Sequence, residues 1–288
     1  MPWTNFHSHS LFCDGADDPE KYILAAINEK IIAYGFSSHA PVNFKTDWCI
    51  PDNRLSEYIE KVKYIKKKYH SEIQTYLGLE IDYIPGVSGR NKHLNYMLDL
   101  DYFIGSVHFC GYFPDGTPWN IDHTPELFLK GLKEIYKNNF RKATEVFYEN
   151  TRLMVTEDKP DVIGHLDKIK MFNNQGFCFD ENEKYYREQV ALTLQTIKNT
   201  GSIVEINTRG YYRYGQLDLY PSQWALEMIA KMDIPVMLNS DCHKADEITA
   251  GFIYAVEILK KAGIQKLWSL LDEKWQGFDF DRTGILPN

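Results

Sequence analysis

Short apolar segments alternate with longer amphipathic segments along almost the whole chain, and this alternation most restricts how it can fold. The apolar segments have the length of strands, whereas the segments between them carry apolar residues at helical spacing. Strands that alternate with helices are typical of a parallel β/α architecture. The sequence therefore predicts an α/β protein with seven parallel strands, at residues 4–9, 32–38, 73–81, 101–107, 161–165, 202–207 and 234–240.

The segments between these strands carry helix signals. Asp18 and Pro19 supply an N-cap and a first-turn proline. Thr124 opens a long helical region that is expected to break near Asn138. Asp180 with Glu183 resembles a capping box, and the glycine at position 201 is expected to end that helix. Further helices are predicted from Pro221 and over residues 245–262.

Side chains that can bind metal ions lie at the C-terminal ends of the predicted strands. His7 and His9 stand one residue apart on the first strand, so both imidazoles point to the same face. In β/α barrels the site lies at the C-terminal ends of several strands, where such side chains converge. The later strands end in or near His39, Glu80, His108, His165, Asp241 and His243, and Arg209 follows the sixth strand. These positions include six of the nine histidines of the chain.

The types of ligand indicate which chemistry to expect. Imidazole and carboxylate groups suit Zn, Mn or Fe, and the number of ligands is sufficient for more than one ion. Several cations in one pocket favour phosphoester hydrolysis, because metal ions activate water and neutralise phosphoryl oxygens. Asp82 shares a strand face with Glu80 and is expected to be an outer or surface carboxylate. His70, His93 and His123 are expected at the surface.

Composition excludes several other classes of protein. The net charge of −8 disfavours a nucleic-acid partner, for which a basic patch is expected. Neither a targeting segment nor a run of about 18 apolar residues is present, so a membrane association is not expected. The five cysteines are scattered, which indicates reduced thiols and a cytoplasmic protein.

The segments "HSHS", "SSHAP", "GLEID", "GSVHF", "GHLD", "EINTRG" and "NSDCH" resemble the successive motifs of the PHP (polymerase and histidinol phosphatase) superfamily. The resemblance covers nearly the whole chain. The segments "SVHFCGYFPDGTPWNID" and "GHLDKIKMF" are similar to those of its monofunctional histidinol-phosphate phosphatase branch. This resemblance implies the PHP fold, a distorted (β/α)7 TIM-like barrel, as a single domain over residues 1–288. It also implies a trinuclear centre of divalent or trivalent metal ions, with Zn, Mn or Fe as the expected metals.

The resemblance also distributes nine side chains over the three ions, with Glu80 bridging the first two. The first ion is assigned His7, His9, Glu80 and Asp241. The second is assigned Glu80, His108 and His165, and the third Asp14, His39 and His243. Some branches of the superfamily carry a histidine where this chain has Asp14, and the carboxylate adds negative charge there.

The activity that the resemblance implies is hydrolysis of L-histidinol phosphate to L-histidinol and phosphate, a step of histidine biosynthesis. Glu80, Asp241 and Arg209 would serve catalysis, with Arg209 holding phosphate oxygens. Trp119 and Asp122 are expected to shape the substrate pocket, and Asp122 is a candidate for binding the amine. Two alternatives stay open: a PHP phosphatase for another small phosphomonoester, such as a nucleotide or sugar phosphate, and a non-catalytic metal-binding protein. A homo-oligomer is compatible with each of these functions.

Overall fold

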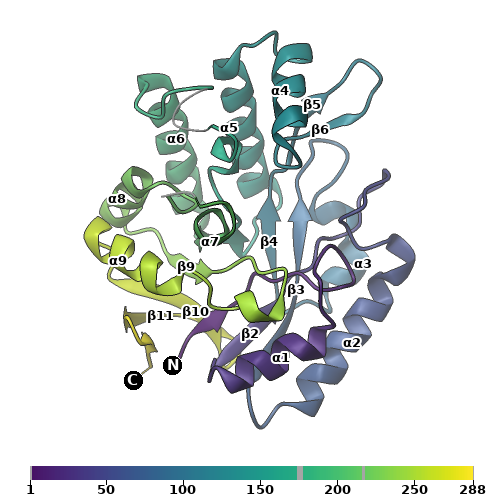
Figure 1. Ribbon diagram of the computed structural model, residues 1–288, viewed down its shortest axis with the longest axis vertical. Helices are drawn as coiled ribbons and strands as arrows, with labels where there is room; N and C mark the ends of the chain where they lie inside the picture. Colours follow the sequence, from purple (N-terminus) through teal and green to yellow (C-terminus); the bar gives the residue numbers. More distant parts are fainter. Residues whose placement is uncertain (1, 174–177, 216–217, 288) are drawn as a thin grey trace.

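The computed structural model describes residues 2–173, 178–215 and 218–287 of the chain, and its central element is a seven-stranded parallel sheet (Figure 1). Neighbouring strands pair in the order β1-β2-β3-β4-β7-β8-β9, and all six pairings are parallel. The strands are β1 (Thr4–Asn5), β2 (Ala33–Phe36), β3 (Gln74–Asp82), β4 (Tyr102–Ser106), β7 (Val162–Ile163), β8 (Ile203–Asn207) and β9 (Val236–Asn239). Each lies at a predicted position, and β3 extends one residue further than expected.

The sheet curls so that its first and last strands nearly meet. A single parallel bridge joins Ser8 to Cys242, just beyond the ends of β1 and β9. There the amide of His9 donates to the carbonyl of Cys242 at 2.9 Å, and the amide of Cys242 donates to the carbonyl of His7 at 3.3 Å. The result is a distorted (β/α)7 barrel, which confirms the predicted fold class.

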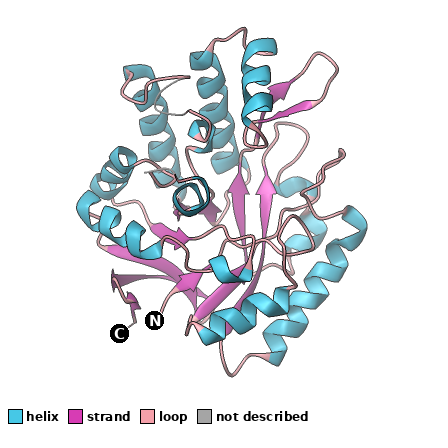
Figure 2. Cartoon of the chain, viewed as in Figure 1, coloured by secondary structure: helices cyan, strands magenta, loops and turns pink. Residues whose placement is uncertain are grey.

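Helices surround the barrel and return the chain between successive strands (Figure 2). They are α1 (Pro19–Asn28), α2 (Leu55–Lys68), α3 (Leu94–Met97), α4 (Pro125–Glu134), α5 (Phe140–Glu157), α6 (Lys184–Thr200), α7 (Arg209–Tyr214), α8 (Gln223–Met232) and α9 (Phe252–Ala262). Short 3-10 turns are η1 (Asp52–Arg54), η2 (Arg90–Lys92), η3 (Lys168–Lys170) and η5 (Ala245–Glu247).

Most of the predicted helix ends are confirmed. Asp18 caps α1 by accepting from the amide of Glu20 at 2.9 Å. The side chain of Asn139 caps α5, which explains the break in the long helical region. The capping box at Asp180 was wrong, because α6 begins only at Lys184 and the Asp180 carboxylate accepts from the amide of Asn182 instead.

Two antiparallel elements were not predicted. A hairpin of β5 (Phe109–Tyr112) and β6 (Pro118–Asn120) follows β4. After α9, a three-stranded sheet is formed by β10 (Lys266–Leu271), β11 (Lys274–Asp281) and β12 (Gly284–Leu286).

The C-terminal sheet covers the N-terminal end of the barrel. Ser269 hydrogen-bonds Thr4 at 2.6 Å, and the ring of Trp275 packs at an edge-on angle against Tyr102. Both partners are the first residues of barrel strands. The two chain ends therefore lie side by side, where the amide of Ile285 donates to the carbonyl of Pro2 (Figure 1).

One cluster of buried apolar side chains includes residues from Trp3 to Ile285. All five cysteines are free, as predicted. Among the described residues, no helix combines the length and apolar character needed to cross a bilayer.

Candidate metal centre

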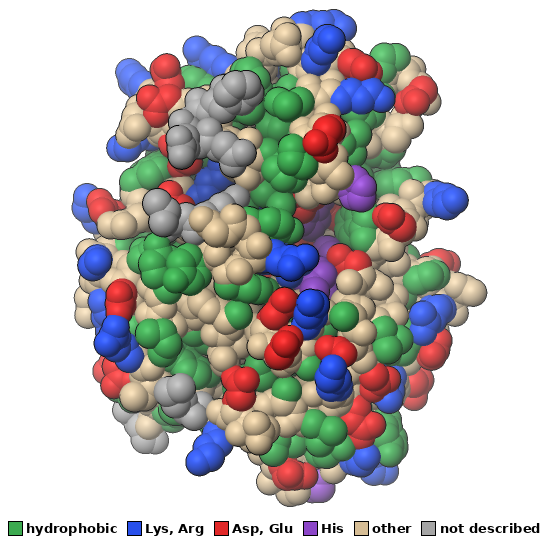
Figure 3. Space-filling view, in the orientation of Figure 1, with side chains coloured by type: hydrophobic (Ala, Val, Ile, Leu, Met, Phe, Trp, Pro, Cys, Tyr) green, Lys and Arg blue, Asp and Glu red, His purple; other side chains and the backbone are tan. Residues whose placement is uncertain are grey.

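A cavity of about 300 Å³ opens at the C-terminal ends of the barrel strands. Figure 3 shows a hollow near the middle of one face in which histidine atoms are exposed, with basic side chains beside them. Its wall is made by predicted residues that lie within or after several of the strands, or in the loop after β1: Asp14, His39, Glu80, His108, His165, Asp241 and His243. His7 and His9 lie below them and are almost completely buried.

The first predicted set of donors is close together around one point. His7 Nε2 lies 3.3 Å from Glu80 Oε2 and 3.7 Å from Asp241 Oδ1. His9 Nε2 lies 3.1 Å from the same Asp241 atom and 3.6 Å from the same Glu80 atom. As expected from their alternate positions, the two histidines present their rings to the same side of the chain.

The second set uses the other oxygen of Glu80. Its Oε1 atom lies 3.0 Å from His165 Nε2 and 3.8 Å from His108 Nε2, and the two nitrogens are 3.1 Å apart. Glu80 thus presents Oε2 to the first group of histidines and Oε1 to the second, which is the arrangement that a bridging carboxylate needs. Its Oε2 atom also lies 2.9 Å from His39 Nδ1.

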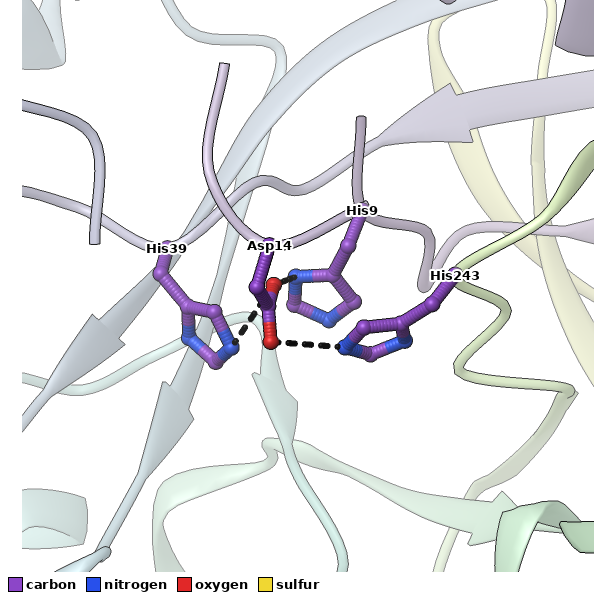
Figure 4. A group of neighbouring side chains, drawn as sticks. All are labelled: His9, Asp14, His39 and His243. Atoms are coloured by element: carbon purple, nitrogen blue, oxygen red, sulfur yellow. Dashed lines mark hydrogen bonds and ion pairs between the residues drawn. The ribbon is translucent and has the colours of Figure 1, made fainter. Parts of the chain in front are cut away.

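Asp14 lies among three imidazoles, as Figure 4 shows. Its Oδ2 atom is 3.1 Å from His243 Nε2, and its Oδ1 atom is 3.9 Å from His39 Nε2 and 3.8 Å from His9 Nδ1. His9 therefore faces two groups at once, with Nδ1 toward Asp14 and Nε2 toward Asp241. Donor atoms of His9, Asp14, His39 and His243 can all meet one ion.

The donors fit a metal site because several of them lack a hydrogen-bond partner among the described residues. His7 Nε2, His9 Nε2 and Glu80 Oε2 are buried and make no hydrogen bond. A buried polar atom without a partner is costly, and a cation in contact with it removes that cost. Buried imidazole and carboxylate donors in this number match the ligand preferences of Zn, Mn and Fe.

Two outer carboxylates orient the histidines. Asp82 Oδ1 lies 2.8 Å from His108 Nδ1, and Glu205 Oε1 lies 2.6 Å from His7 Nδ1. In each case the bonded Nδ1 leaves Nε2 directed into the centre, which is how outer carboxylates fix metal-binding histidines. Glu205 was missed by sequence reasoning. Its signal was an acid inside the short apolar strand β8, the same signal that identified Glu80.

The buried carboxylates of the centre stay ionised. Burial by itself would raise the pKa of Glu80, but the imidazoles of His39, His7 and His108 lower it well below its usual range. Burial would also raise the pKa of Asp241, but His7, His9 and Arg209 lower it well below its usual range. The centre therefore offers anionic oxygen ligands even though these groups are removed from solvent.

Two of the donor residues have an unusual backbone conformation. His165 has a φ of +21° and Asp241 a φ of +53°, which is uncommon for residues other than glycine. Such conformations cost about 1–3 kcal/mol each and cluster at functional sites. They turn the chain sharply after β7 and β9 and direct both side chains into the cavity.

Two cations line the same cavity. Arg209 is half-buried, and its Nη1 donates to the carbonyl of Asp241 at 2.9 Å. Lys168, which sequence reasoning missed, is buried with Nζ 3.4 Å from Asp122 Oδ2. Burial by itself would lower the pKa of Lys168, but Asp122 raises it, so the ammonium group stays charged. The only sequence signal for Lys168 was its place three residues after His165.

Two of the aromatic or imidazole side chains, Trp119 and His93, differ from expectation. Trp119 does not line the cavity, because its ring is fully buried between Phe128 and Tyr136 and its Nε1 donates to the carbonyl of Leu127. It therefore packs the hairpin against α4. His93 is buried rather than exposed. His123 is exposed as expected and also lies at the edge of the cavity, together with Trp48.

A family model described as the PHP domain matches residues 5–209, which is more than two thirds of the chain. The chain belongs to the PHP family. A Schizosaccharomyces pombe member, described as "Probable histidinol-phosphatase", is 30% identical over 274 residues, covering 91% of this chain and 87% of its own. The Bacillus subtilis histidinol-phosphatase is 25% identical over 268 residues, covering 86% and 95%.

A solved PHP structure has the same fold. The histidinol phosphate phosphatase of Lactococcus lactis, crystallised with zinc, L-histidinol and phosphate, superimposes with a TM-score of 0.65. The alignment covers 99% of both chains at 21% identity. The barrel of this chain is therefore the PHP barrel.

Proposed function

We propose that this PHP protein hydrolyses L-histidinol phosphate to L-histidinol and phosphate, as a phosphoric monoester hydrolase of L-histidine biosynthesis. The observation that carries the proposal is that seven candidate metal donors and two cations line one small cavity, with the further candidates His7 and His9 buried below it. The names of the Schizosaccharomyces pombe and Bacillus subtilis relatives support this substrate. A non-catalytic metal-binding role is disfavoured, because storage of ions does not require cations beside the donors.

We further propose three metal ions, with the donors distributed as the family resemblance implies. His7, His9, Glu80 and Asp241 would hold the first, and Glu80, His108 and His165 the second. Asp14, His39 and His243 would hold the third, with His9 next to them. The zinc of the Lactococcus lactis structure supports zinc, although the donor types also suit Mn or Fe. Bound ions would supply an activated water and positive charge for the phosphoryl oxygens.

The remaining side chains of the cavity would bind and orient the substrate. Arg209 can present two parallel N–H groups to phosphoryl oxygens, a geometry that a lysine cannot copy. Lys168 would supply a second positive charge, held in place by Asp122. The Asp122 carboxylate also faces the cavity and is available to the substrate amine. We also propose that residues 1–288 form one domain, which acts in the cytoplasm without a nucleic-acid partner.

A panel of phosphomonoesters tests this function. Purified metal-loaded protein is given L-histidinol phosphate, a nucleoside monophosphate and a sugar phosphate, and phosphate release is measured for each. The proposal predicts that kcat/KM for L-histidinol phosphate exceeds the values of kcat/KM for the nucleoside monophosphate and the sugar phosphate. A preference for the nucleotide or the sugar phosphate would mean that the protein is a PHP phosphatase with a different substrate. Absence of phosphate release from all three compounds would contradict an enzymatic role.

The Arg209→Ala variant is expected to lower kcat/KM about ten- to a hundredfold. A charge-assisted hydrogen bond is worth roughly 1.5–3 kcal/mol, which corresponds to about ten- to a hundredfold in kcat/KM. Arg209→Lys should recover only part of the loss, while metal content stays near wild type. Unchanged kinetics with a clearly lower melting temperature would instead make Arg209 a structural partner of the Asp241 carbonyl.

The Asp14→Ala variant is expected to lose one ion and keep the other two. Asp14 contacts His39 and His243 of the third group, and it meets His9 only at Nδ1, away from the first ion. Its side chain is 31% exposed, so its removal should leave the deeper sites intact. Metal content per chain, measured by plasma mass spectrometry, checks this. Asp17→Ala is the control. Asp17 lies three positions after Asp14, and its carboxylate accepts from the amide of Ala245, so this variant should keep all the metal. Full metal content in Asp14→Ala would leave Asp14 as a turn residue only.

A further inference from the structure

A second cavity, of about 580 Å³, lies beside the metal centre and contains none of its donors. One wall is the segment that follows His39, and the other is the segment between β3 and α3. Its volume is within the range of small-molecule sites. The first cavity is lined by Asp47 and Trp48 from the same segment, but the two cavities share no lining residue.

The floor of this cavity carries two polar side chains without a partner. Ser88 is 7% exposed and His93 is 6% exposed, and both line the cavity. Neither Ser88 Oγ nor His93 Nε2 makes a hydrogen bond to any described residue. Backbone hydrogen bonds hold both positions: Ser88 exchanges bonds with Ile84, and the amide of His93 donates to Arg90. The floor is thus a fixed pair of hydrogen-bonding groups that the protein itself leaves unsatisfied, at a cost.

The imidazole of the floor is neutral. Burial lowers the pKa of His93, and Asp52 only partly opposes this effect. A neutral ring offers one donor or one acceptor at Nε2, and the Ser88 hydroxyl can do either. The floor therefore suits an uncharged hydroxyl or amide group of a ligand better than a charged one.

The walls and the rim have a different character from the floor. Val42, Phe44 and Tyr96 are half-buried and give the cavity apolar walls. The exposed side chains of Lys45 and Lys92 stand at the rim with Asp52, which leaves an excess of one positive charge. This local excess contrasts with the net charge of −8 of the whole chain.

We propose that this cavity binds a small amphipathic carboxylate, with a hydroxyl or similar group on Ser88 and His93, an apolar body between Phe44 and Tyr96, and the carboxylate at Lys45 and Lys92. The depth order of the three layers sets this orientation. Polar groups lie at the bottom, apolar groups lie between, and cations meet solvent, where a carboxylate keeps part of its hydration. The proposal does not depend on the reaction at the metal centre.

Calorimetric titration of the metal-loaded protein with three matched probes tests the proposal. The probes are 4-hydroxybenzoate, benzoate and 4-hydroxybenzyl alcohol, each added in the presence of saturating inorganic phosphate, which occupies the anion site of the metal centre. 4-Hydroxybenzoate should bind about three- to tenfold tighter than benzoate, as expected for one added hydrogen bond. It should also bind about tenfold tighter than the alcohol, which lacks the carboxylate.

Variants of the lining residues show whether the measured heat of binding comes from this cavity. Ser88→Ala should lower the preference for 4-hydroxybenzoate over benzoate, with benzoate affinity unchanged, because the ligand hydroxyl loses one of its two partners. Lys92→Gln should weaken both carboxylates and leave the alcohol unchanged. Lys67→Gln, at an exposed lysine of α2, is the control and should behave as wild type.

Two results would overturn the proposal. Absence of binding of all three probes to the wild-type protein would show that the cavity is not a site for this class. Binding that Ser88→Ala and Lys92→Gln leave unchanged, in variants with wild-type melting temperatures, would place the probes elsewhere.

Discussion

The Glu80→Gln variant is expected to lose phosphate release by more than about a hundredfold, which exceeds the usual effect of changing a residue outside the metal ligands. Glu80 gives one oxygen to the His7 and His9 pair and the other to the His108 and His165 pair. A glutamine has nearly the same volume, so the cavity is preserved. It lacks the negative charge and offers only one oxygen, and therefore cannot serve both groups.

Metal content separates this explanation from a simple loss of stability. The metal occupancy of Glu80→Gln should fall with its activity, while circular dichroism shows a folded barrel. Glu60→Gln, at an exposed glutamate of α2, is the matched control and should keep both metal and activity. Near-normal phosphate release from Glu80→Gln would contradict a mechanism with several metal ions.

The Trp119→Ala variant is expected to lose about 3–5 kcal/mol of unfolding free energy, the usual cost of emptying a large aromatic site. The ring is fully buried, contacts Phe128 and Tyr136, and fills the space beside Gly131, where a Cβ would lie 2.1 Å from its Nε1. Chemical denaturation measures the loss, and the melting temperature should fall by roughly 6–15 °C. At a temperature where the variant is folded, KM should stay near wild type, because Trp119 does not line the cavity.

Trp119→Phe should recover much of this stability, since a ring still fills most of the space. A strong rise in KM with wild-type stability would restore the hypothesis that Trp119 contacts the substrate. The two measurements therefore decide between a packing role and a substrate-binding role for the same side chain.

The barrel strands could be predicted from the sequence because their apolar segments are short, regularly spaced and separated by helices with clear end signals. The metal donors were predictable for a related reason: strand direction places every C-terminal end on one face. His7 and His9 illustrate this, since a period of two is enough to bring both rings together. Asp14 was harder, because it lies in a loop and only the family resemblance indicated a ligand there.

Residues whose role depends on contacts between distant segments could not be found in this way. Lys168 is in a short 3-10 turn, and its importance comes from burial beside Asp122, which lies 46 positions earlier. Trp119 and Asp122 were both expected to shape the pocket, but Trp119 lies on the strand β6 with its ring fully buried, whereas Asp122 lies beyond the end of that strand and lines the cavity. The left-handed backbone of His165 and Asp241 also has no local signal, since neither residue is a glycine.

The bridge between Ser8 and Cys242 has a consequence for how the protein is made. It joins the first ten residues of the chain to a segment more than two hundred positions later, and three donors, His7, His9 and Asp241, stand beside it. During synthesis on the ribosome His7 and His9 emerge more than two hundred positions before their carboxylate partner Asp241. An ion captured early would meet an incomplete set of ligands and bind weakly. Full loading must therefore wait until the segment around Asp241 has emerged and closed the barrel, and the availability of metal in the cell then acts on the folded barrel rather than on the growing polypeptide.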